Sequence, residues 1–146
     1  KQNLIIMATP NTSPIFVLTP NTPTSLISAA NTTRDGSGSL VFAFSAGTNG
    51  SRVDSVIFTN AATGVTASSA MVQRVFLTDT AAANPRLIAE VATATVTPSN
   101  TAIGAQSIIN FTNGLLMQSG QQLKVSQSVY AGVQDIFACY VKGGDY

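Results

Sequence analysis

The chain has 146 residues, the usual length of one compact domain, and can bury a core without a disulfide or a metal staple. Hydrophobic residues make up 45% of it but charged residues only 9%, against about 25% in typical soluble domains, and the formal net charge is +1. The few basic residues are scattered and form no footprint for nucleic acid, and so little charge is typical of a subunit whose surface is partly covered by partners.

Residues 1–24 differ from the rest of the chain. The run TPNTSP at residues 9–14 recurs as TPNTPT at residues 19–24, and these prolines favour extended backbone, so we expect an extended arm. Four consecutive apolar residues stand between the repeats: Ile15, Phe16, Val17 and Leu18. In an extended chain they point alternately to two sides, so we expect them to contact another protein. The alternative is an arm that wraps its own domain.

From residue 25 onward, short β-rich runs alternate with turn residues, which is typical of a sandwich or barrel. The expected strands are 25–30, 39–46, 52–60, 70–78, 86–96, 105–112, 121–130 and 135–142. Asn49-Gly50 predicts a hairpin turn, Asn113-Gly114 predicts another turn, and alternation places Phe42 and Phe44 on one face. We therefore expect an all-β domain over residues 25–146, an eight-stranded β-sandwich or jelly roll with an extended N-terminal arm, its strand order left open.

One hairpin can be predicted in register. Folding the chain symmetrically about residue 82 pairs Arg74 with Glu90 and Phe76 with Ile88 on one face. The opposite face is more continuously apolar and should point into the core; it carries Val75, Leu77, Leu87, Ala89 and Val91. Phe76 and Ile88 are then expected outside the core, either as incidental exposed residues or as a protein–protein contact. A slip of one residue would reverse the two faces.

The side chains that carry most enzyme chemistry are missing. There is no histidine, which excludes Ser-His-Asp and Cys-His catalysis and His-ligated metals. The only cysteine, Cys139, lies in an apolar run and is expected to be a small buried hydrophobe. No phosphate-binding loop or calcium loop is present, and no apolar run reaches the roughly 18 residues of a membrane span. We therefore expect that the protein is not an enzyme and that it binds no cofactor, metal, small-molecule substrate or membrane. The remaining enzymatic alternative is a pair of carboxylates that the fold brings together.

From Ser51 onward the chain contains the segments RVDSVIF at 52–58, MVQRVFL at 71–77, RLIAEV at 86–91 followed by VTPS at 96–99, and GGDY at 143–146. In these segments it resembles small β proteins of tailed-bacteriophage virions. These motifs are structural rather than catalytic. The resemblance implies an auxiliary virion protein, either a capsid cement (decoration) protein or a small tail-associated protein.

On this basis we expect a protein on the outer surface of the virion that binds the major capsid protein and stabilises the shell, as a homotrimer. Such binding depends on buried area and on many copies rather than on a chemical site. The alternative is a receptor- or glycan-binding module of a phage tail or fibre. A low-charge contact surface favours the first hypothesis, whereas clustered exposed aromatic residues with convergent polar groups favour the second.

Overall fold

The protein is an all-β sandwich. Its computed structural model describes residues 17–62, 66–99 and 101–146, and those residues contain nine strands and one 3-10 turn. The elements are β1 (Thr19–Asn21), β2 (Thr24–Ile27), β3 (Val41–Ser45), β4 (Ser51–Asn60), β5 (Met71–Leu77), β6 (Arg86–Thr93), β7 (Gln106–Met117), β8 (Gln122–Gln127), η1 (Val133–Asp135) and β9 (Phe137–Asp145). Each of the eight strands expected from the sequence overlaps one of β2 to β9, although the bounds differ, most of all for β7, which runs to Met117.

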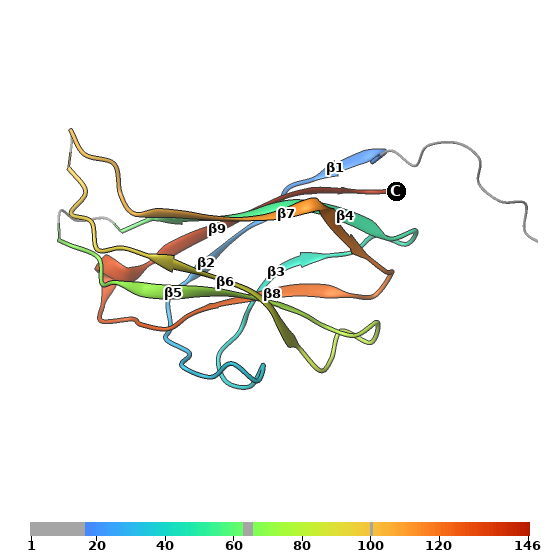
Figure 1. Ribbon diagram of the computed structural model, residues 1–146, viewed down its shortest axis with the longest axis horizontal. Coiled ribbons are helices and arrows are strands. Elements are labelled where there is room, and N and C mark those ends of the chain that lie inside the picture. Colours follow the sequence, from blue (N-terminus) through green and yellow to red (C-terminus); the bar gives the residue numbers. More distant parts are fainter. Residues whose placement is uncertain (1–16, 63–65, 100) are drawn as a thin grey trace, which may run out of the picture.

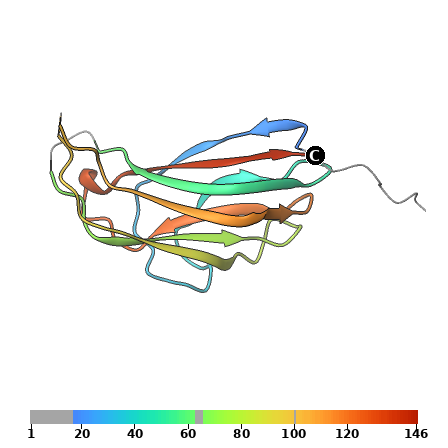
Figure 2. The same ribbon diagram turned by 45° about the horizontal axis from the view of Figure 1, so that its top comes forward.

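The strands form two antiparallel sheets stacked face to face (Figure 1). The first, here called sheet A, has the order β1-β9-β4-β7, and β2 also pairs with β9. The second, sheet B, has the order β3-β8-β5-β6. Because β1 and β2 pair with successive parts of β9, they occupy one row, and the nine strands make eight rows, four in each sheet. Figure 2 shows the rows of sheet A side by side.

The rows pair symmetrically from the two ends of the chain. The β5–β6 hairpin pairs the fourth row with the fifth, β4–β7 the third with the sixth, β3–β8 the second with the seventh, and β1/β2–β9 the first with the last. The chain is therefore arranged as one long hairpin, closed between β5 and β6 and rolled into two layers. The hairpin whose register could be predicted from the sequence is the closed end of this arrangement.

The core lies between the two sheets and is built by alternation along each strand. Its largest fully buried apolar side chains are Phe44, Phe58, Phe137, Ile27 and Leu123. Phe42 is 49% exposed, although strict alternation places it on the same face as Phe44. That prediction was wrong because the register of β3 against β8 shifts between these two residues, which leaves Ala43 as the extra residue of a β-bulge.

Neither predicted Asn-Gly turn joins two strands of one sheet. Asn49-Gly50 lies between β3 and β4, which belong to different sheets, so it forms a connection between the layers. Asn113 and Gly114 take φ values of 64° and 77°, as a tight turn would require, but they lie inside β7. They form a large bulge there, because Asn110 and Leu115 pair with neighbouring parts of β4 on either side of it.

The boundary predicted between arm and domain, at residue 24, does not hold for the described part of the arm. Thr19–Asn21 pairs with Asp145, Gly144 and Gly143 of β9, and the Pro23 carbonyl accepts a hydrogen bond from the Val141 N–H. Proline is tolerated here because the row lies at the edge of the sheet. Residues 17–24 therefore lie against their own domain, as the wrapping alternative requires.

Candidate interaction surfaces

The chemistry-bearing side chains of the described residues are dispersed or buried. In residues 17–62, 66–99 and 101–146, no group of three or more His, Cys, Asp or Glu side chains could hold a metal ion. Over the same part of the chain, no helix has the length and apolar character to cross a membrane. Cys139 is 1% exposed, and burial raises the pKa of its thiol to about 12, so the thiol stays protonated near neutral pH.

The outer face of sheet B is partly covered by the protein's own chain. Residues 30–39, here called the cover segment, leave the β2 row and cross this face below β8, β5 and β6 (Figure 1). Ala30 forms a parallel bridge with Gln127 of β8, and the Asn31 N–H donates to the Gln127 carbonyl at 2.7 Å. At the far side, Gly36 packs so closely that an added Cβ would lie 2.1 Å from the Pro85 carbonyl oxygen.

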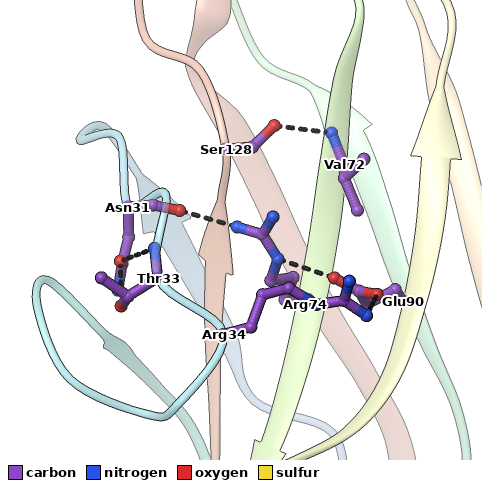
Figure 3. Close-up of polar contacts among 7 residues, drawn as sticks. All are labelled: Asn31, Thr33, Arg34, Val72, Arg74, Glu90 and Ser128. Carbon is purple, nitrogen blue, oxygen red and sulfur yellow. Dashed lines mark hydrogen bonds and ion pairs between the residues drawn. The ribbon is translucent and has the colours of Figure 1, made fainter.

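Two arginines that share one carboxylate hold the cover segment in place (Figure 3). Arg74 of β5 donates from Nε to Glu90 Oε1 at 2.8 Å and from Nη1 to the Asn31 carbonyl at 2.7 Å. Arg34, on the cover segment, donates to Glu90 Oε2 at 2.5 Å. The Arg74 side chain is only 9% exposed, so it is a buried tie between sheet and loop rather than a solvent-exposed ion pair.

Polar side chains also shape the cover segment internally. Asn31 donates from Nδ2 to the carbonyls of Ser37 and Ser39, and its Oδ1 accepts from the Thr33 N–H and hydroxyl. Hydrogen bonds from the Ser37 hydroxyl and N–H hold the pKa of the Asp35 carboxyl below its usual value. The segment is thus a structured loop that is bonded both to itself and to sheet B.

The predicted contact pair Phe76 and Ile88 separates in the structure. The register that pairs Arg74 with Glu90 is confirmed, but it shifts after Val75, so Phe76 pairs with Leu87 and Ile88 becomes the extra residue of a bulge. Val75 lies in the core as expected, with Leu77, Ala89 and Val91 packed against it.

Phe76 points away from the inter-sheet core, as predicted, yet it is 0% exposed; it shares its side of β5 with Arg74, which is tied to the cover segment. It is therefore buried within its own chain and offers no surface to a partner. Ile88 remains at the surface, 37% exposed.

Sheet A presents an open outer face. Along one line across it, Tyr140 of β9 pairs with Ile57 of β4, which pairs with Ile108 of β7; these three residues are here called the apolar row. Leu26 of β2 lies on the same face, opposite Ala138. Leu26 is 60%, Ile108 44% and Tyr140 37% exposed, and no described segment crosses this face (Figures 1 and 2). The open face is thus an exposed apolar surface of the kind that marks protein contacts.

Charge on the open face is confined to one end. Among the side chains that the register places there, Lys142 follows the apolar row along β9, and Arg52 and Asp54 pair with each other at 2.8 Å, both about half exposed. The middle of the face is formed by uncharged residues from all four rows, including Thr24, Thr59, Gln106 and Asn110. A partner can therefore cover this area without desolvating an unpaired charge.

The apolar residues of the arm have different surroundings. Ile15 and Phe16 lie outside the described residues. Leu18 donates its N–H to the Asp145 carbonyl and exposes 79% of its surface, whereas Val17 packs over Gly144 of its own β9. Of the predicted contact residues that the structure describes, Leu18 and Ile88 are exposed; Leu18 lies beside β9 of sheet A, whereas Ile88 lies on β6 of sheet B.

The apolar row was not predicted from the sequence. Each of its members alternates with buried neighbours: Tyr140 stands between Cys139 and Val141, and Ile57 between Val56 and Phe58. This continuous apolar run is typical of a strand covered on both faces, and that was the available signal. Which of these outward residues meet one another depends on the order of strands that are distant in sequence.

Comparisons with known proteins add no relative. No protein-family model matches the chain, and no significant match was found among curated proteins or among solved structures.

Proposed function

We propose that the protein is a structural virion component that binds and stabilises the shell of a tailed-bacteriophage capsid from its outer surface. In this proposal it works as a homotrimer on the major capsid protein, with no chemical step. Many copies, each adding a moderate contact area, would strengthen the shell through multivalency.

The observation that carries the proposal is the contrast between the two outer faces. The outer face of sheet B is partly covered by the cover segment and its arginine ties, although Phe42 of β3 stays 49% exposed there, whereas that of sheet A is crossed by no described segment and displays the apolar row with charge only at one end. A low-charge face left uncovered suits a protein that is normally bound to a larger surface. We therefore place the shell contact on the open face rather than on the face of Ile88.

The strand order supports the same proposal. An eight-row sandwich whose rows pair first with eighth, second with seventh, third with sixth and fourth with fifth is a long hairpin rolled into two layers. We infer that this is a jelly roll, an architecture common to viral capsid and lectin domains. Fold alone does not assign a function, so the jelly roll raises the expectation of a virion role without establishing it.

The lectin-like alternative, a receptor- or glycan-binding module, receives less support from the surface. A sugar platform needs exposed aromatic side chains gathered with convergent polar groups. The large exposed aromatic residues of the described chain are Phe42 and Tyr140, which lie on different sheets. We therefore retain this alternative only as an outcome of the binding test.

The test is co-sedimentation of purified protein with capsid shells that lack it. Tyr140→Ser combined with Leu26→Ser removes apolar surface from the open face, and we expect about a tenfold or greater loss of shell affinity. Ile88→Ser is the matched control, because Ile88 and Tyr140 are both 37% exposed but lie on opposite sheets. Circular dichroism would show that the variants remain folded.

Three results would contradict the proposal in different ways. A loss of binding in Ile88→Ser alone would move the contact to the margin of sheet B, as the sequence suggested. Full binding by both variants would mean that the shell contact lies neither at Tyr140 and Leu26 nor at Ile88. Binding of the wild type to cell-surface glycan, without binding to shells, would favour the receptor-binding alternative.

A further inference from the structure

The sandwich has four sheet edges, and three of them carry features that oppose pairing with another strand. The β1/β2 row contains Pro20 and is interrupted by Pro23. Strand β3 has five residues and is divided by the bulge at Ala43. Strand β6 carries Arg86 and Glu90. Proline, short or bulged strands and charged side chains are the usual protections of an exposed edge.

The fourth edge, β7, lacks these protections over its first half. Its twelve residues include no charged residue and no proline, and its bulge begins only after Asn110. Residues 106–110 pair with β4 alone among the described strands, and no backbone hydrogen bond joins them to another part of the described chain. Half of the backbone groups of this segment therefore face away from the sheet without a described partner.

The side chains of this segment are complementary to themselves. Its outer-face residues are Gln106, Ile108 and Asn110, with Ile108 in the middle. In an antiparallel pairing of two copies centred on Ile108, the two isoleucines would lie opposite each other. Each Gln106 amide would lie opposite an Asn110 amide of the second copy, and both kinds of cross-strand pair are favourable.

We propose that residues 106–110 pair antiparallel with the same residues of a second copy, about a two-fold axis at Ile108. The contact is isologous, since each copy contributes the same segment. It joins the two A sheets into one continuous sheet, and the apolar row of one copy continues directly into that of the other. The surface available to a large partner is thereby doubled in width.

This inference concerns contact between copies and does not depend on the proposed capsid role. A two-fold contact joins two monomers into a dimer of twice the mass, and between the proposed trimers it would link one trimer to another. Because a single short edge buries little area, we expect the pairing to be weak in dilute solution and strengthened where many copies are held side by side.

Sedimentation velocity over a wide range of protein concentration tests the pairing. We expect the wild-type protein to double in mass as its concentration rises, and Ile108→Lys to raise the dissociation constant about tenfold, because like charges would lie directly opposite. Leu26→Lys is the matched control: it places the same charge on the open face, but at the opposite edge of sheet A. We expect this control to pair within about twofold of the wild type.

Mixing charged variants tests the register itself. If residue 108 faces its own copy, Ile108→Lys and Ile108→Glu should each pair poorly alone but pair well when mixed. Hydrogen exchange gives a second readout on the unaltered protein, with amides of residues 106–110 gaining protection as concentration rises. Constant mass and constant protection at all concentrations would overturn the proposal, and so would an equal loss in Leu26→Lys or a mixture that fails to pair.

Discussion

The buried ion pair between Arg74 and Glu90 should contribute more to the stability of the protein than an exposed ion pair of the same length. Two ion pairs in this protein have the same length, 2.8 Å, and involve the same arginine atom, Nε. Arg74 and Glu90 have side-chain exposures of 9% and 25%, whereas Arg52 and Asp54 have 43% and 45%. Replacing each carboxylate by its amide, Glu90→Gln and Asp54→Asn, therefore compares burial at fixed distance and similar chemistry.

The expected magnitudes follow from what each change leaves behind. Glu90→Gln leaves the Arg74 guanidinium almost fully buried beside a neutral amide, and a hydrogen bond to a charged group contributes about 1.5–3 kcal/mol. The exposed bond to Arg34 adds little. Asp54→Asn leaves Arg52 in water, so its cost should stay below about 0.5 kcal/mol. For a chain of this size, the Glu90 change lowers Tm by about 5–10 °C.

Urea unfolding followed by far-UV circular dichroism measures both costs, since the protein contains no tryptophan for fluorescence. Arg34→Ala is a further check: it removes the exposed member of the cluster and should cost less than Glu90→Gln. If Asp54→Asn destabilises the protein as much as Glu90→Gln, burial does not determine the value of these pairs. The account of the cover segment as a tied element would then be wrong.

Three further predictions concern buried sites. Phe76→Ala should lower the free energy of unfolding by about 3–5 kcal/mol and Ile88→Ala by less than about 1 kcal/mol, measured by urea titration; similar costs would mean that Phe76 is not covered. Cys139, with its pKa raised to about 12, should resist a thiol reagent at pH 8 until the protein is unfolded, and rapid native labelling would contradict its burial. Gly36→Ala should destabilise the protein by more than about 1 kcal/mol, because φ is 91° and the added Cβ meets the Pro85 carbonyl; an unchanged Tm would show that the cover segment can move away.

The strands could be predicted because local composition carries them. Runs of β-branched and aromatic residues separated by turn residues located β2 to β9 without knowledge of their neighbours. The register of the β5–β6 hairpin was also accessible, because a short connection restricts which residues can face each other. The same register holds from Met71 to Val75 and fails at Ile88, where β6 bulges.

β-Bulges explain why the sequence predicted the wrong face of the strand for some side chains. Ala43 and Ile88 lie in runs whose alternation looks regular, and neither is a residue type that marks a bulge. Each bulge adjusts one strand to a neighbour that is distant in sequence, so a window of local sequence does not contain its cause. Phe76 is an outward residue that is nevertheless buried, on the side of β5 where Arg74 binds a second distant element, the cover segment.

The candidate surface was less accessible for the same reason. The apolar row joins Tyr140, Ile57 and Ile108, which are brought together only by the order β9-β4-β7. The composition did predict that some low-charge surface would be available to a partner, because few charged residues exist to cover it. It could not indicate that the cover segment lies over part of one sheet and leaves the other open.

The hypothesis of an N-terminal arm can now be tested separately for the residues that pair with the domain itself. The sequence suggested that residues 1–24 fasten the domain to something outside its own core, so that deleting them would leave Tm nearly unchanged. In the structure, Thr19–Asn21 pairs with β9, Leu18 donates to the Asp145 carbonyl at 2.9 Å, and Asn21 Nδ2 donates to Asp145 Oδ2 at 3.1 Å. Deletion through residue 24 would therefore remove a paired strand together with any external contact.

Two truncated chains, beginning at Val17 and at Thr22, separate these roles, because they differ only in residues 17–21. The hydrogen bonds of this stretch contribute about 0.5–1.5 kcal/mol each, while ordering its backbone costs about 1–2 kcal/mol per residue, so the two contributions largely offset. The packing of Val17 over Gly144 and the second bond to Asp145, already held by Ser51, favour the ordered state. We therefore expect the free energy of unfolding of the chain that begins at Thr22 to be about 1–2 kcal/mol lower than that of the chain that begins at Val17, measured by urea titration. Equal stability of the two chains, with shell binding lost only by the shorter one, would instead show that residues 17–21 act as the external fastening that the sequence suggested.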